Sequence, residues 1–289
     1  MRGPEFLRQR VGKLKSRMGG VIPGSHATIR GVDLHATFKD AEWMDIYMFG
    51  ITGRRFSKNE LALLQSIWTY TSYPDARIWN NRVAALAGSA RSTGALAISA
   101  ALAVSEAKIY GGGTYMPSVA FLQTSRKKIL AGASIADCVA EELRARRGIA
   151  GYGRPLTSKD ERIAPLMTRA HELGLDNGPH VRLAVEIDRY LVEHRLRMRA
   201  NYAAIAAGLI ADLELSPREF YLCVFPVFLA GMLPCYLEAL EQPEGAFFPI
   251  PCDDIAYAGR EKRIWGEQSE VNGTGATISY PPAGLATGE

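Results

Sequence analysis

The chain has 289 residues, 47% of them hydrophobic and 22% charged, which is enough apolar material for one large core or two modest ones and argues against intrinsic disorder. The net charge of +4 is only mildly basic. The arginine clusters have neither interleaved aromatic side chains on which bases could stack nor a known nucleic-acid-binding motif, so nucleic-acid binding is disfavoured. The four cysteines form no C-x-x-C pair, and no histidine stands at ligand spacing from them, which disfavours a disulfide framework and a structural metal site.

The N-terminal segment sets the expected compartment and contains the best strand candidate. Its first residues, MRGPEFLRQRVGKLKSR, lack the apolar centre of a secretory signal, so we expect a cytoplasmic protein. Residues Ala27 to Val32 alternate weakly between apolar and polar side chains and predict an edge hairpin at most. After residue 40 the apolar spacing is helical nearly throughout, which predicts an all-α fold class.

Three helix starts are marked by the pattern S-x-x-E. In such a capping box the serine and the glutamate each accept a hydrogen bond from a backbone amide that the first helical turn leaves unpaired. The pattern begins at Ser57, Ser158 and Ser216, and Pro217 occupies a first helical position, where a missing amide costs nothing. We therefore expect a helix to begin after each of these serines.

Two later segments have an unusual composition. Residues 82–106, RVAALAGSARSTGALAISAALAVSE, are rich in alanine, glycine and serine, and such small side chains let helices approach closely in a packed core or at a dimer seam. Residues 221–237, YLCVFPVFLAGMLPCYL, form the most apolar run, but this run is shorter than a bilayer span and contains two prolines. We interpret it as a buried helix and expect no membrane association.

Glycine-rich stretches at 111–113 and 151–153 resemble nucleotide-binding loops only superficially. Neither completes G-x-G-x-x-G, neither is followed by a lysine at P-loop spacing, and no predicted strand precedes either. A tight turn or a helix cap that needs a positive φ explains these glycines better. The sequence therefore predicts no required cofactor.

Six segments stand in a specific order along the chain: FGITGRRFSKNEL, SYPDARIWNNRVAALAGS, IYGGGTYM, GYGRPLTSKDER, RANYAAIAAGLIADL and CDDIAYAG. Over residues 28–260 this order resembles the citrate synthase superfamily, and within it the short citryl-CoA lyase type, which is similar to the C-terminal module of ATP-citrate lyase. The resemblance implies a helical homodimer. Each subunit would have a large domain, formed by residues 1–111 and 236–289, and a small domain, formed by residues 112–235.

The resemblance also implies which positions carry the family's catalytic groups, and each of them is substituted here. The family's histidine in its D-H segment falls on Asp75, and the histidine that the synthases have before the paired glycines falls on Tyr110. The histidine of the G-x-G-H segment falls on Arg154, the catalytic aspartate on Asn201, and a carboxylate-binding arginine on Gly231. A neutral amide cannot act as a base and a guanidinium does not titrate in the useful range, so we expect no standard citrate chemistry.

The positions that the resemblance implies for substrate binding are better preserved. The arginine of the family's D-P-R segment, which holds a substrate carboxylate, corresponds to Arg162, where a guanidinium can bind an anion bidentately. The backbone amides of Gly151 and Gly153 would lie along the arm of a CoA thioester, the candidate substrate. The paired glycines Gly111 and Gly112 belong to the same predicted substrate-binding site.

The substituted positions also have structural explanations. Asp75 follows Pro74 and suits a turn or an N-cap as well as catalysis. Tyr110 could simply pack beside the glycines, and Arg154 could pair with Asp75 in an inert cleft. In the alternative, Arg154 and Arg162 bracket one helix start, whose exposed amides would complete an anion site.

Two functional classes remain open. The first is a divergent enzyme that makes or breaks a C–C bond, or performs other acyl chemistry, on a carboxylate or an acyl-CoA, with Asp75 as the base and Arg154 and Tyr110 as electrophilic helpers. The second is a non-catalytic paralogue that binds a ligand or a partner and regulates, including by pairing with a catalytically complete relative. Neither class needs a metal.

Overall fold

The computed structural model describes residues 3–12, 16–107, 111–153, 159–247 and 249–260. Its contacts divide the chain into two compact units, residues 1–248 and residues 249–289, and each unit is described by itself. Among the described residues, helices account for 62% and strands for 5%, which confirms the predicted all-α class. The division of the first unit into parts of a large and a small domain stays a prediction.

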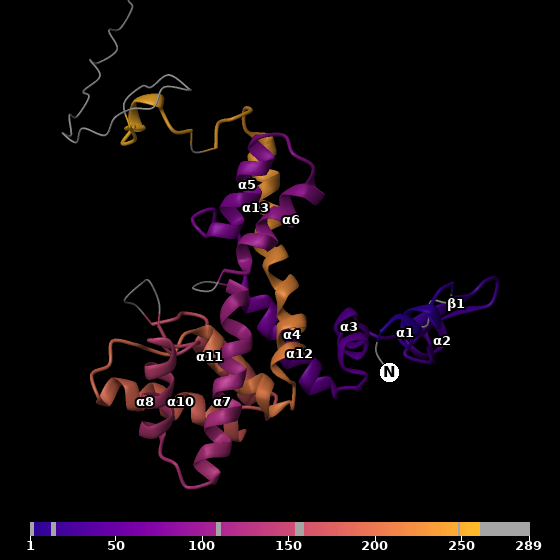
Figure 1. The fold of residues 1–289 in the computed structure, drawn as a ribbon, viewed down its shortest axis with the longest axis vertical. Helices are drawn as coiled ribbons and strands as arrows, with labels where there is room; N and C mark the ends of the chain where they lie inside the picture. The colour runs from indigo at the N-terminus through magenta and orange to yellow at the C-terminus, as the bar shows by residue number, and fades with distance from the viewer. Residues whose placement is uncertain (1–2, 13–15, 108–110, 154–158, 248, 261–289) are drawn as a thin grey trace, which may run out of the picture. The chain divides into compact units, whose positions relative to one another are not determined.

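Three short strands come early in the first unit, and helices follow them along the chain (Figure 1). The elements are α1 Pro4–Arg8, β1 Gly19–Ile22, β2 His26–Ile29, β3 Val32–Asp33, α2 Leu34–Thr37, α3 Trp43–Thr52, α4 Lys58–Thr71, α5 Trp79–Ser89, α6 Gly94–Ser105, η1 Gly111–Thr114, α7 Tyr115–Leu130, α8 Ile135–Arg146, α9 Ile163–Glu172, α10 Pro179–Glu193, α11 Tyr202–Asp212, α12 Pro217–Val224, η2 Phe225–Phe228 and α13 Leu229–Glu241. The second unit contains the short 3-10 helix η3, Cys252–Asp254.

The strands form a small antiparallel sheet in the order β1-β2-β3. Gly19 of β1 pairs with Ile29 of β2, and Thr28 of β2 pairs with Asp33 of β3. The expectation of a hairpin at most is therefore wrong. The strand β1 escapes detection because Gly19 and Gly20 have low strand propensity and because all its residues are exposed, which removes the alternation that marks a half-buried strand.

Capping boxes begin two of the helices where the sequence predicts them. The helix α4 begins after Ser57, whose hydroxyl accepts a hydrogen bond from the Glu60 amide at 3.3 Å. The helix α12 begins in the same way after Ser216, with Pro217 in the first helical position. Both predictions are confirmed. The helix α8 begins at a box that the S-x-x-E pattern misses, since Asp137 stands where the pattern requires glutamate.

The third predicted helix start is wrong. Ser158 lies outside the described residues, and α9 begins at Ile163 rather than directly after that serine. The start is set by Asp160, whose carboxylate accepts from the Arg162 amide at 3.2 Å and whose carbonyl oxygen accepts from the Ile163 amide at 3.2 Å. This turn makes Arg162 the N-cap residue of α9.

The helix α11 lies at the centre of the core of the first unit. All residues from Tyr202 to Ala211 are buried, and the helix packs against α4, α7 and α10 (Figure 1). Gly208 permits the contact with α10, because a Cβ atom at that position would lie 2.7 Å from the Cα atom of Val181. The two helices can therefore approach this closely only with glycine at position 208.

We expect Gly208→Ala to lower the free energy of unfolding by roughly 1 to 3 kcal/mol, because the added methyl group overpacks the seam with α10. Gly50→Ala in α3 is the matched control, since its Cβ atom would meet the Ile29 side chain at an ordinary 3.6 Å. The control should keep its stability or gain about 1 kcal/mol from better helix propensity. Urea unfolding measures both, and equal stabilities would contradict the close approach.

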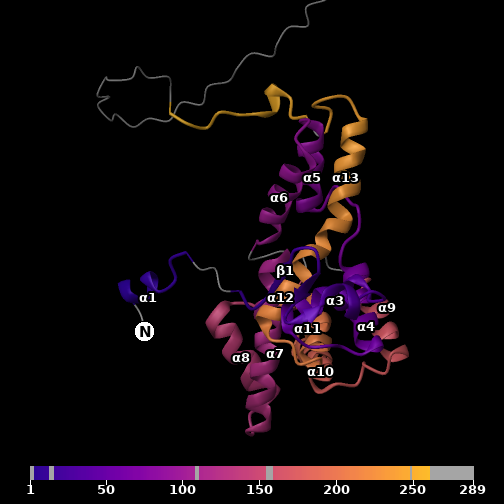
Figure 2. The same cartoon turned by 90° about the vertical axis from the view of Figure 1, so that its right-hand side faces the viewer.

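The helices α5, α6 and α13 lie side by side in both views (Figure 1 and Figure 2). Gly88 of α5 faces α13, where an added Cβ atom would lie 2.5 Å from the Tyr236 carbonyl oxygen. The small residues of segment 82–106 therefore pack a seam inside the chain, which is one of the two explanations of its composition. Their predicted part in a dimer seam stays a prediction.

The run Pro217–Glu241, which joins α12, η2 and α13, is long and apolar enough to cross a membrane by length and composition, since it contains an 18-residue window with a mean hydropathy of 1.9. Its side chains Phe220, Cys223 and Met232 belong to the hydrophobic core, and the 3-10 turn η2 interrupts it. These contacts support its interpretation as a core helix.

Candidate active-site cleft

A cleft with a volume of about 460 Å³ lies where several helices begin. It is walled by the C-terminal end of α4 and by the N-terminal ends of α5, α7, α9 and α11. Its volume falls in the range of small-molecule sites, roughly 300 to 1,000 Å³. The cleft brings together five of the predicted site residues, namely Asp75, Gly111, Gly153, Arg162 and Asn201.

Four helices begin at the wall of the cleft. Trp79, Tyr115 and Tyr202 are the first residues of α5, α7 and α11, and all three line the cleft. Arg162, the N-cap residue of α9, lines it as well. Each helix N-terminus carries about half a positive charge, which favours anionic ligands. At the start of α11 the Tyr202 and Ala203 amides already donate to Asp160 and Asn201. Only the tertiary fold brings these starts together, so no sequence pattern could predict their convergence.

Asp75 lies on the cleft wall and is ion-paired with Arg77. The Nε and Nη2 atoms of Arg77 donate to its carboxylate at 3.0 and 2.7 Å, and the Arg77 amide donates at 2.9 Å. These hydrogen bonds from Arg77 lower the pKa of Asp75, which is therefore ionised at neutral pH. The Asp75 side chain is 22% exposed, so a cleft ligand can reach it. The predicted turn is present, and the catalytic role stays a prediction.

Arg162 is held by a buried carboxylate. Its Nε and Nη2 atoms donate to the two oxygens of Asp160 at 2.9 and 2.8 Å, and its Nη1 atom donates to the Thr71 carbonyl oxygen at 3.1 Å. The Asp160 side chain is fully buried and also accepts from the Tyr202 amide at 2.9 Å. Burial raises the pKa of Asp160, but the hydrogen bonds and charge of Arg162 together with the Tyr202 amide outweigh it, so this pKa lies below its ordinary value.

The Arg162 guanidinium can still bind an anion. It carries five N–H bonds, and the contacts to Asp160 and Thr71 use three of them, so Nη1 and Nη2 each keep a second hydrogen. The side chain is 26% exposed and lies over the Tyr202 ring, with 4.8 Å between the guanidinium carbon and the ring centre. A bidentate grip on a carboxylate through Nη1 and Nη2 is therefore compatible with the Asp160 ion pair.

Asn201 ties the glycine loop to the start of α11. Its Oδ1 atom accepts from the Ala203 amide at 2.9 Å, as an N-cap does, and its Nδ2 atom donates to the Gly153 carbonyl oxygen at 2.8 Å. Its backbone amide donates to the Gly151 carbonyl oxygen at 2.9 Å. Both ends of the side-chain amide are thus engaged in structure, and neither can take up a proton as a carboxylate does.

The glycine loop itself needs glycine at its first position. Gly151 has a φ of 86°, and a Cβ atom there would lie 2.9 Å from the Cα atom of Ala204. Gly153 has a φ of 125° and faces open space, but its amide donates to the Arg199 carbonyl oxygen at 2.7 Å. A CoA arm bound along the Gly153 amide would have to replace this hydrogen bond. The ligand-binding role of both glycines stays a prediction.

The paired glycines also occupy a tight turn. Gly111 has a φ of 75°, and a Cβ atom there would lie 2.5 Å from the Ser105 carbonyl oxygen, while Gly112 is buried beside it. The turn explanation therefore holds for Gly111, and a role in substrate binding is untested for both. Tyr110 and Arg154 lie outside the described residues, so their catalytic roles and the pairing of Arg154 with an aspartate stay predictions.

Gly231 packs under the cleft wall. A Cβ atom there would lie 2.6 Å from the Tyr73 carbonyl oxygen and 2.9 Å from Asn81 Oδ1, and its amide donates to Ser72 Oγ at 3.1 Å. This backbone leaves no room for an arginine side chain at position 231.

No sequence pattern singled out Asn81, a buried cleft residue whose Nδ2 atom donates to the carbonyl oxygens of Tyr73 and Asp75.

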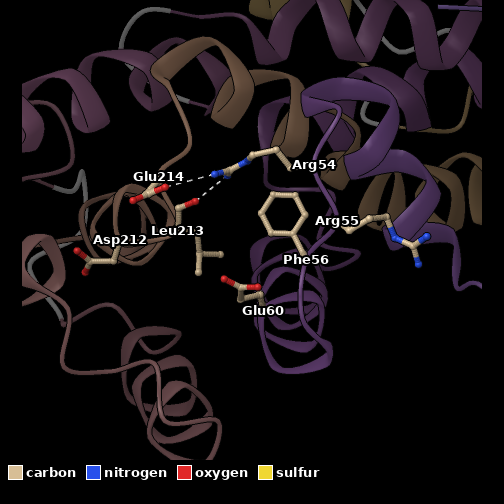
Figure 3. Close-up of a pocket in the computed structure, with 7 residues that line it drawn as sticks. All are labelled: Arg54, Arg55, Phe56, Glu60, Asp212, Leu213 and Glu214. Atoms are coloured by element: carbon tan, nitrogen blue, oxygen red, sulfur yellow. Dashed lines mark hydrogen bonds and ion pairs between the residues drawn. The ribbon is translucent and has the colours of Figure 1, made fainter. Parts of the chain in front are cut away.

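A second hollow, of about 280 Å³, lies between the loop before α4 and the end of α11 (Figure 3). Arg54 donates to the Leu213 carbonyl oxygen at 2.8 Å and pairs with Glu214 at 3.5 Å. Asp212 accepts from the His180 amide at the start of α10. We assign these contacts a structural role.

Within the part of the chain that the structure describes, no group of His, Cys, Asp and Glu side chains could hold a metal ion.

Comparison of the sequence with protein-family models and with curated proteins gives no match. Comparison of structures matches the citryl-CoA lyase of Hydrogenobacter thermophilus with a TM-score of 0.74 and 18% identity, over 87% of this chain and 96% of that chain. The ATP citrate lyase of Methanosaeta concilii, a mutant in complex with (3S)-citryl-CoA, matches with a TM-score of 0.70 and 14% identity, over 91% of this chain and 43% of that chain. The citrate synthase of Thermotoga maritima matches with a TM-score of 0.59 and 19% identity, over 78% of this chain and 60% of that chain.

These likenesses define the class: the chain has the fold of the citrate synthase superfamily, as the order of sequence segments predicts. Among these structures it resembles the citryl-CoA lyase, of which it spans nearly the whole length, more than it resembles the citrate synthase. It spans less than half of the ATP citrate lyase chain. Because all these identities are below 20%, the likeness shows the fold alone, and the substitutions at the catalytic positions stay untested.

Proposed function

We propose that this protein binds a carboxylic acid or an acyl-CoA-type thioester in the cleft and makes or breaks a C–C bond, or performs other acyl chemistry, without standard citrate chemistry. One observation carries the proposal: four helix starts converge on a cleft in which Arg162 keeps two unused N–H bonds. Such an arrangement favours a carboxylate or a phosphate. The citryl-CoA and the coenzyme A bound by ATP citrate lyases of the same fold support this class of ligand.

Within this proposal Asp75 is the base. Its carboxylate is ionised, is oriented by Arg77 and is partly exposed at the cleft. A positioned carboxylate assists the removal of a proton beside a thioester, and a hydrogen-bond donor stabilises the enolate oxygen that forms. Because the lowered pKa makes Asp75 a weaker base than an ordinary aspartate, the enolate needs a strong donor. We assign this role to Arg154 with Tyr110, by resemblance to the family.

A thermal-shift screen tests the proposal. We expect at least one of CoA, acetyl-CoA, citrate and oxaloacetate to raise the melting temperature, because a ligand that binds only the folded state stabilises it, by roughly 2.7 kcal/mol at about 100 times its Kd. Incubation of the stabilising ligand with the protein, followed by mass spectrometry, then shows whether it is converted. The absence of any shift across the screen would contradict the proposal.

A non-catalytic ligand-binding regulator is the second candidate, and the state of Asn201 favours it. Asn201 stands where the resemblance places the catalytic aspartate, and its side-chain amide caps α11 and fixes the Gly153 carbonyl oxygen. A residue engaged in this way secures a fold without taking part in proton transfer. Ligand binding with no conversion in the same mass-spectrometry assay would select this candidate.

We also expect a homodimer. The helices α5, α6 and α13 expose large apolar side chains that a subunit interface would cover, namely Leu86, Leu96, Leu233 and Leu237, between 44% and 64% exposed. Sedimentation velocity at micromolar concentration should give a dimer for the wild type and a monomer for Leu96→Glu. The matched control is Leu130→Glu at the end of α7, where a 71% exposed leucine should be replaceable without effect. A monomeric wild type would overturn this expectation.

A further inference from the structure

The loop between α4 and α5 forms part of the cleft wall, and its backbone is held at several points. The Tyr73 carbonyl oxygen accepts from Asn81 Nδ2 at 2.8 Å and from the Asp75 amide at 3.0 Å. Beside it, Ser72 Oγ accepts from the Gly231 amide at the start of α13 at 3.1 Å. These contacts fix the backbone on both sides of Tyr73.

The loop presents side chains to the cleft at alternate positions. Tyr73, Asp75 and Arg77 all line the cleft. Asp75 and Arg77 hold each other in an ion pair, with 2.7 Å between Oδ2 and Nη2. Tyr73 takes no part in this pair, but the fixed backbone keeps its ring in the same wall.

Among the tyrosines that line the described cleft, Tyr73 is the most exposed. Tyr202 and Tyr115 are buried, at 3% and 6% exposed, and the Tyr202 hydroxyl donates to the Ile67 carbonyl oxygen at 3.0 Å. Tyr73 is 42% exposed, and no contact among the described residues uses its hydroxyl. A phenol hydroxyl can donate one hydrogen bond. The Tyr73 hydroxyl can therefore donate to a ligand in the cleft.

Tyr73 also lies near two guanidinium groups. Burial lowers the pKa of Arg162, but the hydrogen bonds and charge of Asp160, with smaller contributions that include Tyr73, raise it above its ordinary value. Asp75 raises the pKa of Arg77, and Tyr73 again adds a smaller contribution. A carboxylate held by Arg162 Nη1 and Nη2 keeps further lone pairs that a neighbouring hydroxyl can use.

We propose that Tyr73 is a ligand-binding residue of this cleft, whose hydroxyl donates a hydrogen bond to the carboxylate that Arg162 holds. This inference rests on the proposed function and adds a second donor, from a different segment of the chain, to its acid-binding site. Two donors from separate segments fix the orientation of the acid as well as its position. They would thereby decide which carbon of the acid faces Asp75.

Isothermal titration calorimetry of Tyr73→Phe with citrate and with oxaloacetate tests this inference. The substitution removes one hydroxyl group at an exposed position, so the melting temperature of the ligand-free protein should not change. We expect the affinity for the tighter-binding acid to fall about tenfold, because a hydrogen bond to a carboxylate is among the stronger ones. Tyr70→Phe is the matched control, since Tyr70 belongs to α4 but is not among the residues that line the cleft, and it should leave the affinity unchanged.

A double-mutant cycle with Arg162→Lys tests whether the two residues hold the same carboxylate. If they do, the loss in the double variant should be at least about threefold smaller than the product of the two single losses, because each contact depends on the other. Single losses that simply multiply would overturn the shared carboxylate.

The outcomes separate this inference from the proposed function. If Tyr73→Phe binds the acid as tightly as the wild type, or Tyr70→Phe loses as much affinity, the inference is overturned, and a loss in Arg162→Lys alone still upholds the proposed function. A lower ligand-free melting temperature in Tyr73→Phe would give the hydroxyl a structural role and overturn the inference as well. If neither acid binds the wild type, the inference fails, and a positive thermal shift with CoA or acetyl-CoA would still uphold the proposed function.

Discussion

Asp160→Asn is expected to lower the free energy of unfolding by about 3 to 5 kcal/mol. The Asp160 carboxylate is fully buried, is ion-paired with Arg162 and accepts from the Tyr202 amide. Removing its charge leaves the Arg162 guanidinium, 26% exposed, without a counter-charge and weakens the link between the starts of α9 and α11. Urea unfolding followed by circular dichroism measures the loss.

The chain contains a matched control for this variant. Asp188 makes a similar two-bond contact with Arg199, at 3.1 and 3.0 Å, but its side chain is 21% exposed beside a half-exposed guanidinium. Because water screens this pair, Asp188→Asn should cost roughly 1 kcal/mol. Equal losses in Asp160→Asn and Asp188→Asn would contradict the importance of burial at Asp160.

The contribution of Asp160 has a defined pH window. Its pKa in the folded state lies below the unfolded value of about 3.9, so the unfolded state binds the proton first as the pH falls. The stabilisation is therefore fully present above the unfolded pKa and is lost as the pH falls through the folded pKa. The deficit of Asp160→Asn should stay constant from neutral pH to about pH 5 and shrink below about pH 4. A deficit that grows toward acid pH would contradict this sign.

Turnover of oxaloacetate with acetyl-CoA, or of citryl-CoA, is expected to be at least about 100-fold below the ~10 per second of a typical enzyme. The resemblance places the family's base at Asn201, whose amide can neither accept a proton from the substrate nor leave its bonds to Ala203 and Gly153 without cost. Release of the CoA thiol, followed with a thiol reagent, measures both reactions. An active citrate synthase in the same buffer is the positive control.

Asn201→Asp sharpens this second prediction. Aspartate caps a helix as well as asparagine does, so the start of α11 should persist, although the hydrogen bond to the Gly153 carbonyl oxygen is lost. We expect the variant to stay below the same limit, because Arg154 and Tyr110 still replace the family's histidines. Wild-type turnover near about one per second would show that the catalytic positions are wrongly assigned.

Local patterns predict the elements whose stabilising contacts are local. The capping boxes at Ser57 and Ser216 join residues three positions apart, so the sequence alone reveals both helix starts. The start of α9 could not be predicted in this way. The turn of Asp160 with Arg162 and Ile163 that sets this start is local but lacks the S-x-x-E form. The Asp160 carboxylate is also held by the Tyr202 amide 42 positions later, and no window of neighbouring residues contains that contact.

Part of the candidate site could likewise be predicted from the sequence, and part of it could not. The order of motifs predicts that Asp75, Arg162 and Asn201 belong to one site, and they line one cleft. The same order predicts an arginine free to bind substrate at position 162 but not its buried partner Asp160, because a motif carries no information on burial. The exposure of Trp79 at the cleft likewise follows from the packing of α5 in the fold and has no sequence signal.

The central claim is that Arg162 anchors an acidic ligand in this cleft, and calorimetric titration of Arg162→Lys tests it most directly. Lysine keeps a positive charge beside Asp160 but loses the planar fork that grips a carboxylate. Arg169→Lys on the same helix, at a 39% exposed arginine paired with Glu172, is the matched control. With the acid that stabilises the wild type best, we predict about tenfold or greater loss of affinity for Arg162→Lys and none for Arg169→Lys. Equal affinities of the two variants, or no binding of any acid to the wild type, would contradict the claim.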